Sequence, residues 1–159
     1  MSFPHIPIVA VRDEEQARRC FPVFRELRPH LDELTFLARW REQTASGYEI
    51  VAIESDGEVA AAAGFRELST MAWGRILYLD DLIALPNFRG RGFGSVLLQF
   101  LQRETVTRGC AELHLDTGYA RHDAHRSYLR NRFDLICHHM AWTSPAEAQL
   151  IDSVRGMHS

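Results

Sequence analysis

The sequence predicts a mixed α/β domain in which helices pack on the faces of a single sheet. The chain has 159 residues, of which 46% are hydrophobic and 25% charged, and this is the composition of one soluble globular domain. Apolar segments with strand-like and helix-like spacing follow each other in the order β-α-α-β-β-β-α-β-α-β. This order is neither a regular βαβ alternation nor an all-β pattern, so we expect parallel and antiparallel strands in one sheet.

Capping and turn residues delimit the elements of the first half. Asp13 can cap the first helix, and Pro22 should break or kink that helix. Asp56–Gly57 lies between two apolar segments and is a strong signal for a hairpin turn. The expected elements are a strand over 6–12, helices over 13–27 and 31–47, and strands over 48–55, 58–68 and 74–85. The last of these strands is almost continuously apolar, as expected of a strand covered on both faces.

A glycine-rich stretch opens the second half. The expected elements after it are a helix over 94–109, a strand over 111–118, a helix over 122–132 and a last strand over 133–143. The length of that segment accommodates one strand, whose free edge would need to be covered by the following residues or by a second copy of the chain. We therefore expect a homodimer. We assign residues 1–143 to the folded domain and 144–159 to a C-terminal tail.

Charge and composition exclude several classes of function. The net charge of −3 argues against a nucleic-acid surface, because phosphate binding depends on a basic face. No apolar segment is long enough to cross a bilayer, and the first residues lack the pattern of a signal peptide, so we expect a cytoplasmic protein with no membrane partner. Cys20, Cys110 and Cys137 lack metal-ligand spacing, so we expect reduced thiols and no metal.

Residues 87–98, with the sequence NFRGRGFGSVLL, indicate an anion site. Glycine lets the chain turn sharply and lets a ligand approach the backbone N–H groups. Such a loop before a helix presents these groups and the positive end of the helix dipole to an anion. Ser95 stands where a dinucleotide motif would need its third glycine, and the lysine of a P-loop is missing. The alternative is a glycine-rich turn that only joins a strand to a helix.

The six residues Arg89-Gly90-Arg91-Gly92-Phe93-Gly94 resemble the R-x-x-G-x-G acyl-CoA motif of the GNAT N-acetyltransferases. The element order resembles that family as well, from Ile8 to Trp142. The resemblance implies acetyl-CoA as the acyl-donor cosubstrate, with its pyrophosphate on the loop amides and its pantetheine arm along the preceding strand. The cofactor-binding residues that it implies are Leu82, Ile83, Ala84, Arg89, Gly90, Arg91, Gly92, Phe93, Gly94, Ser95, Ala124 and Tyr128.

Further matches to the family lie downstream. Ala124 and Tyr128 keep the spacing of its Asn-x-x-Ala motif and the tyrosine that follows, and Phe133 is also present. Arg121 stands where asparagine is usual, and Arg132 stands where glycine is usual. The first departure concerns one contact to the pantetheine arm. The second concerns the turn into the last strand.

Acetyl transfer needs a neutral amine, a polarised thioester carbonyl and a proton for the departing thiolate. By resemblance, Tyr128 donates that proton and the backbone N–H of Ala84 polarises the carbonyl. A carboxylate can attract an ammonium group and relay its proton, and Asp80 matches an acidic position of polyamine-type relatives. Asp80 is our first choice over Asp81, and strand alternation should point the two to opposite faces. The alternative is that both aspartates are structural ion-pair partners.

We therefore expect an N-acetyltransferase that moves the acetyl group of acetyl-CoA to a primary amine by direct transfer in a ternary complex. The sequence does not identify the acceptor, which is a small molecule or a peptide amine. Glu49, Glu54, Glu67 and Asp80 are compatible with a cationic amine. The alternative function is a non-catalytic module of the same fold that binds CoA or acyl-CoA.

Overall fold

The computed structural model of the chain describes residues 6–145 and residue 147. The chain divides into two units, residues 1–115 and 116–159. The elements of the first unit are β1 (Val9–Ala10), α1 (Glu14–Leu27), α2 (Glu33–Ala45), β2 (Glu49–Ser55), β3 (Glu58–Thr70), β4 (Gly74–Ala84), the 3₁₀ helix η1 (Pro86–Phe88), α3 (Phe93–Thr107) and β5 (Glu112–Leu115). The second unit contains α4 (His122–Arg130).

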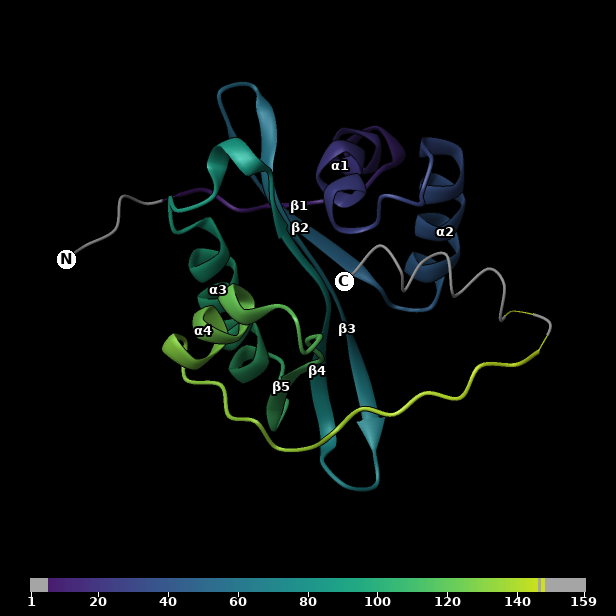
Figure 1. The fold of residues 1–159 in the computed structure, drawn as a ribbon. Coiled ribbons are helices and arrows are strands. Elements are labelled where there is room, and N and C mark those ends of the chain that lie inside the picture. The colour runs from purple at the N-terminus through teal and green to yellow at the C-terminus, as the bar shows by residue number, and fades with distance from the viewer. Residues whose placement is uncertain (1–5, 146, 148–159) are drawn as a thin grey trace. The chain divides into compact units, whose positions relative to one another are not determined.

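The predicted mixed sheet is confirmed. Its strand order is β1-β2-β3-β4-β5, with antiparallel pairing from β1 to β4 and parallel pairing between β4 and β5. Helices α1 and α2 lie on one side of the sheet and α3 lies on the other, as Figure 1 shows. The four consecutive alanines at 60–63 in β3 are all 0% exposed, because the central strand is covered on both faces.

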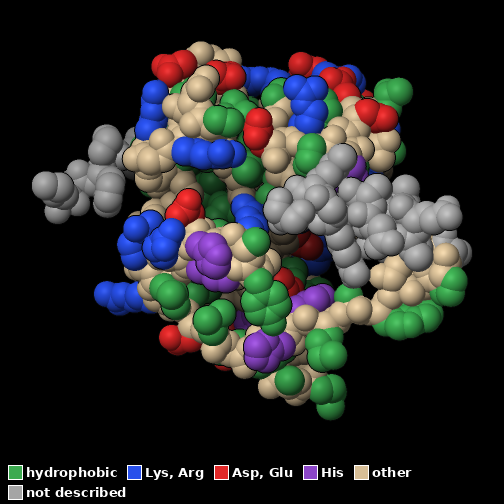
Figure 2. Space-filling view, in the orientation of Figure 1, with side chains coloured by type: hydrophobic (Ala, Val, Ile, Leu, Met, Phe, Trp, Pro, Cys, Tyr) green, Lys and Arg blue, Asp and Glu red, His purple; other side chains and the backbone are tan. Residues whose placement is uncertain are grey.

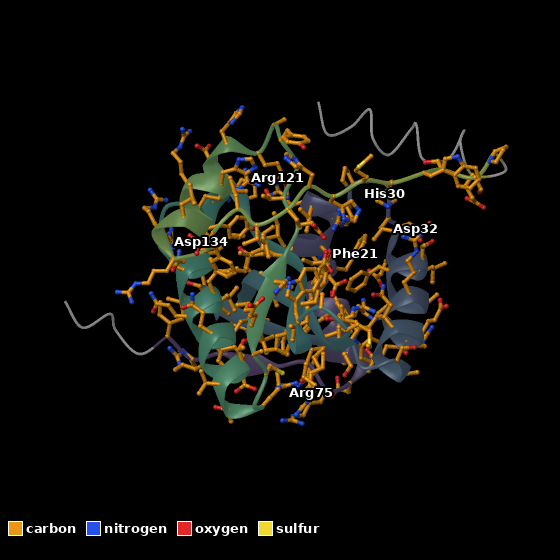
Figure 3. The ribbon with its side chains drawn as sticks, turned by 90° about the horizontal axis from the view of Figure 1, so that it is seen from below. Phe21, His30, Asp32, Arg75, Arg121 and Asp134 are labelled. Atoms are coloured by element: carbon orange, nitrogen blue, oxygen red, sulfur yellow. The ribbon has the colours of Figure 1, made fainter. Side chains whose placement is uncertain are left out.

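Local signals explain where these elements begin and turn. The side chain of Asp13 accepts a hydrogen bond from the N–H of Gln16, at 2.8 Å, and so caps α1. Asp32, which lies directly before α2 (Figure 3), accepts from the N–H of Thr35 at 2.7 Å in the same way. In the β2–β3 hairpin, Asp56–Gly57 has φ values of 54° and 81°, both in the left-handed region that a two-residue hairpin turn requires.

Of the break or kink predicted at Pro22, the break is wrong, because α1 continues through this residue. Proline removes one helical hydrogen bond and leaves the carbonyl of Arg18 without its usual amide partner. Pro22 is exposed, as Arg18 is, so water can reach the carbonyl that loses its partner. The neighbouring residues Phe21 and Val23 are buried, and their packing offsets the local cost.

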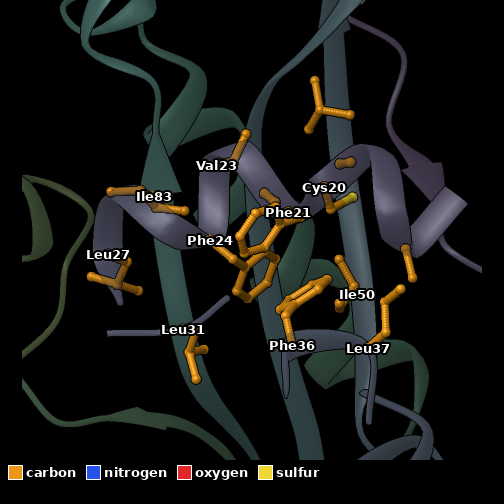
Figure 4. Close-up of a cluster of buried hydrophobic side chains, with 14 of the residues drawn as sticks. Cys20, Phe21, Val23, Phe24, Leu27, Leu31, Phe36, Leu37, Ile50 and Ile83 are labelled. Atoms are coloured by element: carbon orange, nitrogen blue, oxygen red, sulfur yellow. The ribbon is translucent and has the colours of Figure 1, made fainter. Parts of the chain in front are cut away.

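An aromatic cluster fills the space between the sheet and the first two helices. Figure 4 shows Phe21 and Phe24 of α1 next to Phe36 of α2. The ring centroids of Phe21 and Phe36 are 5.7 Å apart, and those of Phe24 and Phe36 are 5.1 Å apart. All three rings are buried and together remove a large apolar area from water. On the other face, α3 packs on β3 and β4 through its buried residues Leu97, Leu98 and Leu101.

The register between β3 and β4 shifts at Asp80. Gly64 of β3 pairs with Asp81, and the next residue, Phe65, pairs with Leu79. Asp80 is therefore an extra residue on β4, which makes this point a β-bulge. A bulge interrupts the regular alternation of side chains, and this interruption decides how the two aspartates are oriented.

The predicted last strand over 133–143 is not formed, and the described residues hold five strands rather than six. These residues belong to the second unit, whose described part contains α4 and no strand. A strand needs a partner for its ladder, and the unit offers none there. The homodimer expected from the free edge of that strand stays a prediction. Of the expected tail, 144–159, only residues 144, 145 and 147 lie within the described part.

The end of α4 explains how arginine replaces the glycine usual after this helix. The N–H of Arg132 donates to the carbonyl of Leu129, at 3.0 Å, and the N–H of Phe133 donates to the carbonyl of Tyr128, at 3.1 Å. These two bonds form a Schellman motif, whose left-handed position is normally glycine. Arg132 occupies it with φ at 67°. The turn is therefore kept at the expense of backbone strain.

We expect Arg132→Gly to stabilise the protein by about 1 kcal/mol, because glycine adopts the left-handed conformation without strain. The measurement is the free energy of unfolding from urea denaturation. The control is Arg130→Gly, two residues earlier and inside α4, which should destabilise by about 1 kcal/mol because glycine lowers helix propensity. Destabilisation by both substitutions would contradict the strain at Arg132.

Candidate functional site

The glycine loop between η1 and α3 exposes its backbone. Gly90 and Gly92 have φ values of 77° and 82°, in the region where other residues are strained. Among the described residues, apart from the chain neighbours and the backbone of α3 itself, no atom lies within 4 Å of a Cβ placed on Gly90, Gly92 or Gly94. No side chain caps α3, and its first hydrogen bond runs from the N–H of Val96 to the carbonyl of Gly92. The loop and the start of α3 thus form an open cradle that suits an anion.

Aromatic and arginine side chains hold this loop in place. Phe88 is 3% exposed, and its ring lies 6.2 Å from that of Phe93. The guanidinium of Arg91 lies over the Phe88 ring, 4.9 Å from its centroid. Arg89 turns back toward β4, where its Nε donates to the carbonyl of Ala84 at 3.3 Å. Arg89 therefore fastens the loop to β4, and Arg91 packs on η1.

The second half of β4 directs backbone groups away from β3. The N–H of Leu85 donates to the carbonyl of Ala60 at 2.9 Å, and hydrogen-bonded pairs alternate along an antiparallel ladder. The backbone groups of Ile83 therefore face β3, whereas those of Leu82 and Ala84 face the opposite edge. Because β5 pairs only with the first half of β4, no β5 residue pairs with Leu82 or Ala84.

Asp80 and Asp81 point to the same face of the sheet, and the prediction of opposite faces is wrong. Asp81 contacts Arg28 at the end of α1 and Tyr48 before β2. Asp80 contacts Arg66 of β3, whose guanidinium lies over the Tyr48 ring, 5.2 Å from its centroid. The bulge at Asp80 is the cause, because the extra residue places two successive side chains on one side.

The two carboxylates differ in the number of hydrogen bonds that they accept. Asp81 Oδ1 accepts from Nη2 and Nε of Arg28, at 3.0 and 3.3 Å, and its Oδ2 accepts from the hydroxyl of Tyr48 at 2.7 Å. Asp80 Oδ2 accepts from Nε of Arg66 at 2.9 Å. Among the described residues, no donor reaches Asp80 Oδ1. The Asp80 side chain is 25% exposed and that of Asp81 is 15% exposed. Asp80 thus keeps one oxygen available.

Burial raises the pKa of Asp80 above its usual range, and the neighbouring charge of Asp81 adds to this rise. The hydrogen bond and the positive charge of Arg66 act in the opposite direction. A carboxylate with a raised pKa is a better proton acceptor than an ordinary one. This combination favours Asp80 over Asp81 for proton transfer.

Sequence reasoning did not place Arg28, Tyr48 and Arg66 beside the two aspartates. They lie in three separate parts of the chain, so no local sequence motif predicts that they come together. One signal was available, because an isolated glycine inside an apolar strand indicates a bulge or a close approach of another group. Gly64 in β3 is such a glycine, and it lies beside both the bulge and Tyr48.

The other acidic residues proposed for a cationic amine are paired with arginines. Glu49 binds Arg108, Glu54 binds Arg19 and Glu67 binds Arg75, at 2.5, 2.8 and 3.0 Å. Arg75 projects outward near the β3–β4 turn (Figure 3). In the view of Figure 2, acidic and arginine side chains are intermixed over the upper part of the molecule. All 18 residues counted as lysine or arginine are arginines. The charges of these glutamates are therefore compensated within the chain.

In the second unit, Ala124 and Tyr128 lie four residues apart on α4 and are both half-buried. Phe133 holds the Tyr128 ring, with the centroids 5.8 Å apart. Burial raises the pKa of the Tyr128 hydroxyl, and the charge of Arg121 opposes this rise. Arg121 is the N-cap residue of α4 and gives no side-chain cap, whereas the asparagine usual at this position could accept a backbone hydrogen bond.

The described residues contain neither a candidate metal site nor a candidate membrane span. No group of three histidine, cysteine or acidic residues in this part of the chain could hold a metal ion. Within the same residues, no helix combines the length and the apolar character needed to cross a membrane.

The family model of the acetyltransferase (GNAT) family matches residues 12–133. The chain therefore belongs to the GNAT acetyltransferases. It is 28% identical over 116 residues to the uncharacterized N-acetyltransferase YhdJ of Bacillus subtilis, covering 72% of this chain and 82% of YhdJ. It is 31% identical over 91 residues to streptothricin acetyltransferase of Streptomyces lavendulae, covering 57% of this chain but only 47% of that enzyme.

The fold matches solved acetyltransferases at lower identity. The structure of the aminoglycoside N-acetyltransferase AAC(6')-Iy in complex with CoA gives a TM-score of 0.76 at 18% identity, covering 89% of this chain and 95% of that one. Ribosomal-protein-alanine N-acetyltransferase from Brucella melitensis gives a TM-score of 0.75 at 16% identity, covering 87% and 99%. These two likenesses concern the fold.

Proposed function

We propose that this protein transfers the acetyl group of acetyl-CoA directly to a primary amine in a ternary complex. The observation that carries the proposal is the open glycine cradle before α3, in a chain of the GNAT family. The left-handed conformations of Gly90 and Gly92 leave room where a side chain would block an approaching phosphate.

Acetyl-CoA would extend from this cradle along β4. The loop from Arg89 to Ser95 supplies backbone N–H groups and the helix dipole for its pyrophosphate. The pantetheine arm would hydrogen-bond to the backbone groups of Leu82 and Ala84, which face away from β3. Ile83, whose backbone groups face β3, would contribute through its position in the strand. The N–H of Ala84 is our candidate for polarising the thioester carbonyl.

Two side chains would move protons during the transfer. The free oxygen of Asp80 would accept a proton from the ammonium form of the acceptor, directly or through water. The neutral amine then attacks the thioester carbon, the N–C bond forms and the C–S bond breaks. Tyr128 would give its proton to the departing thiolate, and the second proton that the nitrogen loses as the amide forms would restore the Tyr128 hydroxyl, directly or through water. No enzyme side chain is acylated in these reaction steps, because the amine attacks acetyl-CoA itself.

We propose a small-molecule or peptide amine as the acceptor. The test is a screen of polyamines, amino acids, aminoglycosides and peptide N-termini, with release of CoA as the readout. At least one amine should accelerate CoA release above the rate with acetyl-CoA alone. Tight binding of acetyl-CoA without acceleration by any amine would identify a non-catalytic CoA-binding module instead.

We expect Gly92→Val to raise the Kd for acetyl-CoA by more than about 10-fold, because the valine strains the loop and fills the space in front of it. Isothermal titration with acetyl-CoA gives the Kd. Gly109→Val is the matched control, since Gly109 has φ at 66° and open space around its Cβ but lies after α3. Both variants should lose stability, and only the first should lose affinity. Equal affinity in the two variants would refute the cradle.

We expect Asp80→Asn to lower kcat/KM for the acceptor by roughly 10²- to 10⁴-fold, the usual contribution of a general base. In the wild type, activity should fall as the pH drops through the pKa of Asp80. That fall should begin at a higher pH than for an ordinary carboxyl, because the pKa is raised. The variant should lack this acidic limb. Glu67→Gln, which removes a carboxylate paired with Arg75, should keep the wild-type profile.

We expect Tyr128→Phe to lower kcat by about 10²- to 10⁴-fold and to leave the Kd for acetyl-CoA unchanged. The ring and its contact with Phe133 remain, and only the proton donor is lost. Because burial raises the pKa of Tyr128, the hydroxyl stays protonated at neutral pH, so the loss should be constant between about pH 6 and 9. Wild-type turnover in this variant would exclude Tyr128 as the donor. Tyr119→Phe, which removes an exposed hydroxyl, is the control.

A further inference from the structure

We propose that Tyr48 is a positioning residue for the acceptor amine, which it serves by holding the β4 bulge so that Asp80 presents its free oxygen. Tyr48 lies between α2 and β2, and it touches the bulge from outside the strand. The inference rests on the role of Asp80 in the proposed function. It adds a residue that no motif of the family resemblance contains.

The hydroxyl of Tyr48 reaches Asp81 through a space that a glycine leaves open. A Cβ on Gly64 would lie 1.7 Å from the hydroxyl oxygen of Tyr48 and 2.4 Å from its Cζ. Any other residue at position 64 would therefore displace the ring. With glycine there, Tyr48 is 4% exposed and its hydroxyl donates to Asp81 Oδ2 at 2.7 Å. The ring is thus fixed at both its face and its tip.

This contact acts at the point where the strand register changes. Gly64 pairs with Asp81, and Asp80 is the unpaired residue directly before Asp81. Holding the side chain of Asp81 therefore fixes one end of the bulge. Arg28 supports the same carboxylate through its other oxygen, so Asp81 is held from two elements.

The face of the same ring supports the partner of Asp80. The guanidinium of Arg66 lies over the Tyr48 ring, 5.2 Å from its centroid, while its Nη2 donates to Oε1 of Gln43 at 2.6 Å. Its Nε donates to Asp80 Oδ2. Tyr48 thus orients both neighbours of Asp80, one through its hydroxyl and one through its ring. What remains for a substrate is Asp80 Oδ1.

Tyr48 acts as a hydrogen-bond donor and not as an acid in this arrangement. Burial raises the pKa of its hydroxyl well above the ordinary value, and the charges of Asp81 and Asp80 raise it further. Arg66 opposes the rise. The hydroxyl therefore stays protonated across the pH range of an enzyme assay and can donate to Asp81 throughout it.

The first experiment is a double-mutant cycle with an amine found in the acceptor screen as the probe. Tyr48→Phe keeps the ring and the contact with Arg66 and removes one hydrogen bond. We expect kcat/KM for the amine to fall by about 10- to 100-fold, as displacement of a reacting group does, with the Kd for acetyl-CoA unchanged. In an Asp80→Asn background the same substitution should cost nothing further. An equal loss in both backgrounds would overturn the role of Tyr48.

A second pair of variants separates positioning from folding. Gly64→Ala forces the ring of Tyr48 away and should lower both the stability and kcat/KM. Adding Tyr48→Leu removes the clashing atoms, so stability should recover while kcat/KM stays low. Recovery of both would show that the residue supports the fold alone.

The outcomes also separate this inference from the function on which it rests. If Asp80→Asn retains wild-type activity, the roles of both Asp80 and Tyr48 fall. If Asp80→Asn is impaired and Tyr48→Phe is fully active, only the role of Tyr48 falls.

Discussion

Successive side chains of a strand alternate between the two faces of the sheet, and an extra residue between two paired neighbours interrupts this alternation. In β4 the extra residue is Asp80. The arrangement of the candidate site follows from that geometry. Two successive carboxylates come to lie on the face covered by α1 and α2, within reach of arginines from α1 and β3. Without the extra residue, Asp80 and Asp81 would lie on opposite sides of the sheet, and each would be left to find its own partners.

The charges in this cluster are balanced, with two aspartates against two arginines. A buried carboxylate is costly unless it is paired, so Arg28 and Arg66 make the position of the aspartates tolerable. Balance also changes how an amine would be recognised. The cluster has little net charge with which to attract a cation from a distance. Recognition would depend on a direct hydrogen bond to the one oxygen of Asp80 that the described residues leave without a donor.

Much of the fold could be predicted because its signals are local. Asp13 and Asp56–Gly57 each act within a few residues, and they correctly mark the start of α1 and the β2–β3 turn. The tolerance of Pro22 depends on which side of α1 faces water. The direction of Asp80 depends on pairing with β3, and the segment 133–143 has strand-like residues but no ladder partner in its unit. These outcomes arise from contacts between segments that are distant in the sequence. The spacing of residue types along the chain does not predict such contacts.

The chain contains arginines but no lysine, and this has a chemical consequence for an enzyme that transfers acetyl groups to amines. Guanidinium groups keep their proton at any pH at which the protein is folded, so they are poor nucleophiles toward a thioester. A lysine ε-amine is a nucleophile once it loses its proton, and none of the 159 residues is a lysine. No lysine side chain of this chain therefore competes with an amine substrate for the acetyl group. An acetylated lysine recovered from a reaction mixture comes from another molecule.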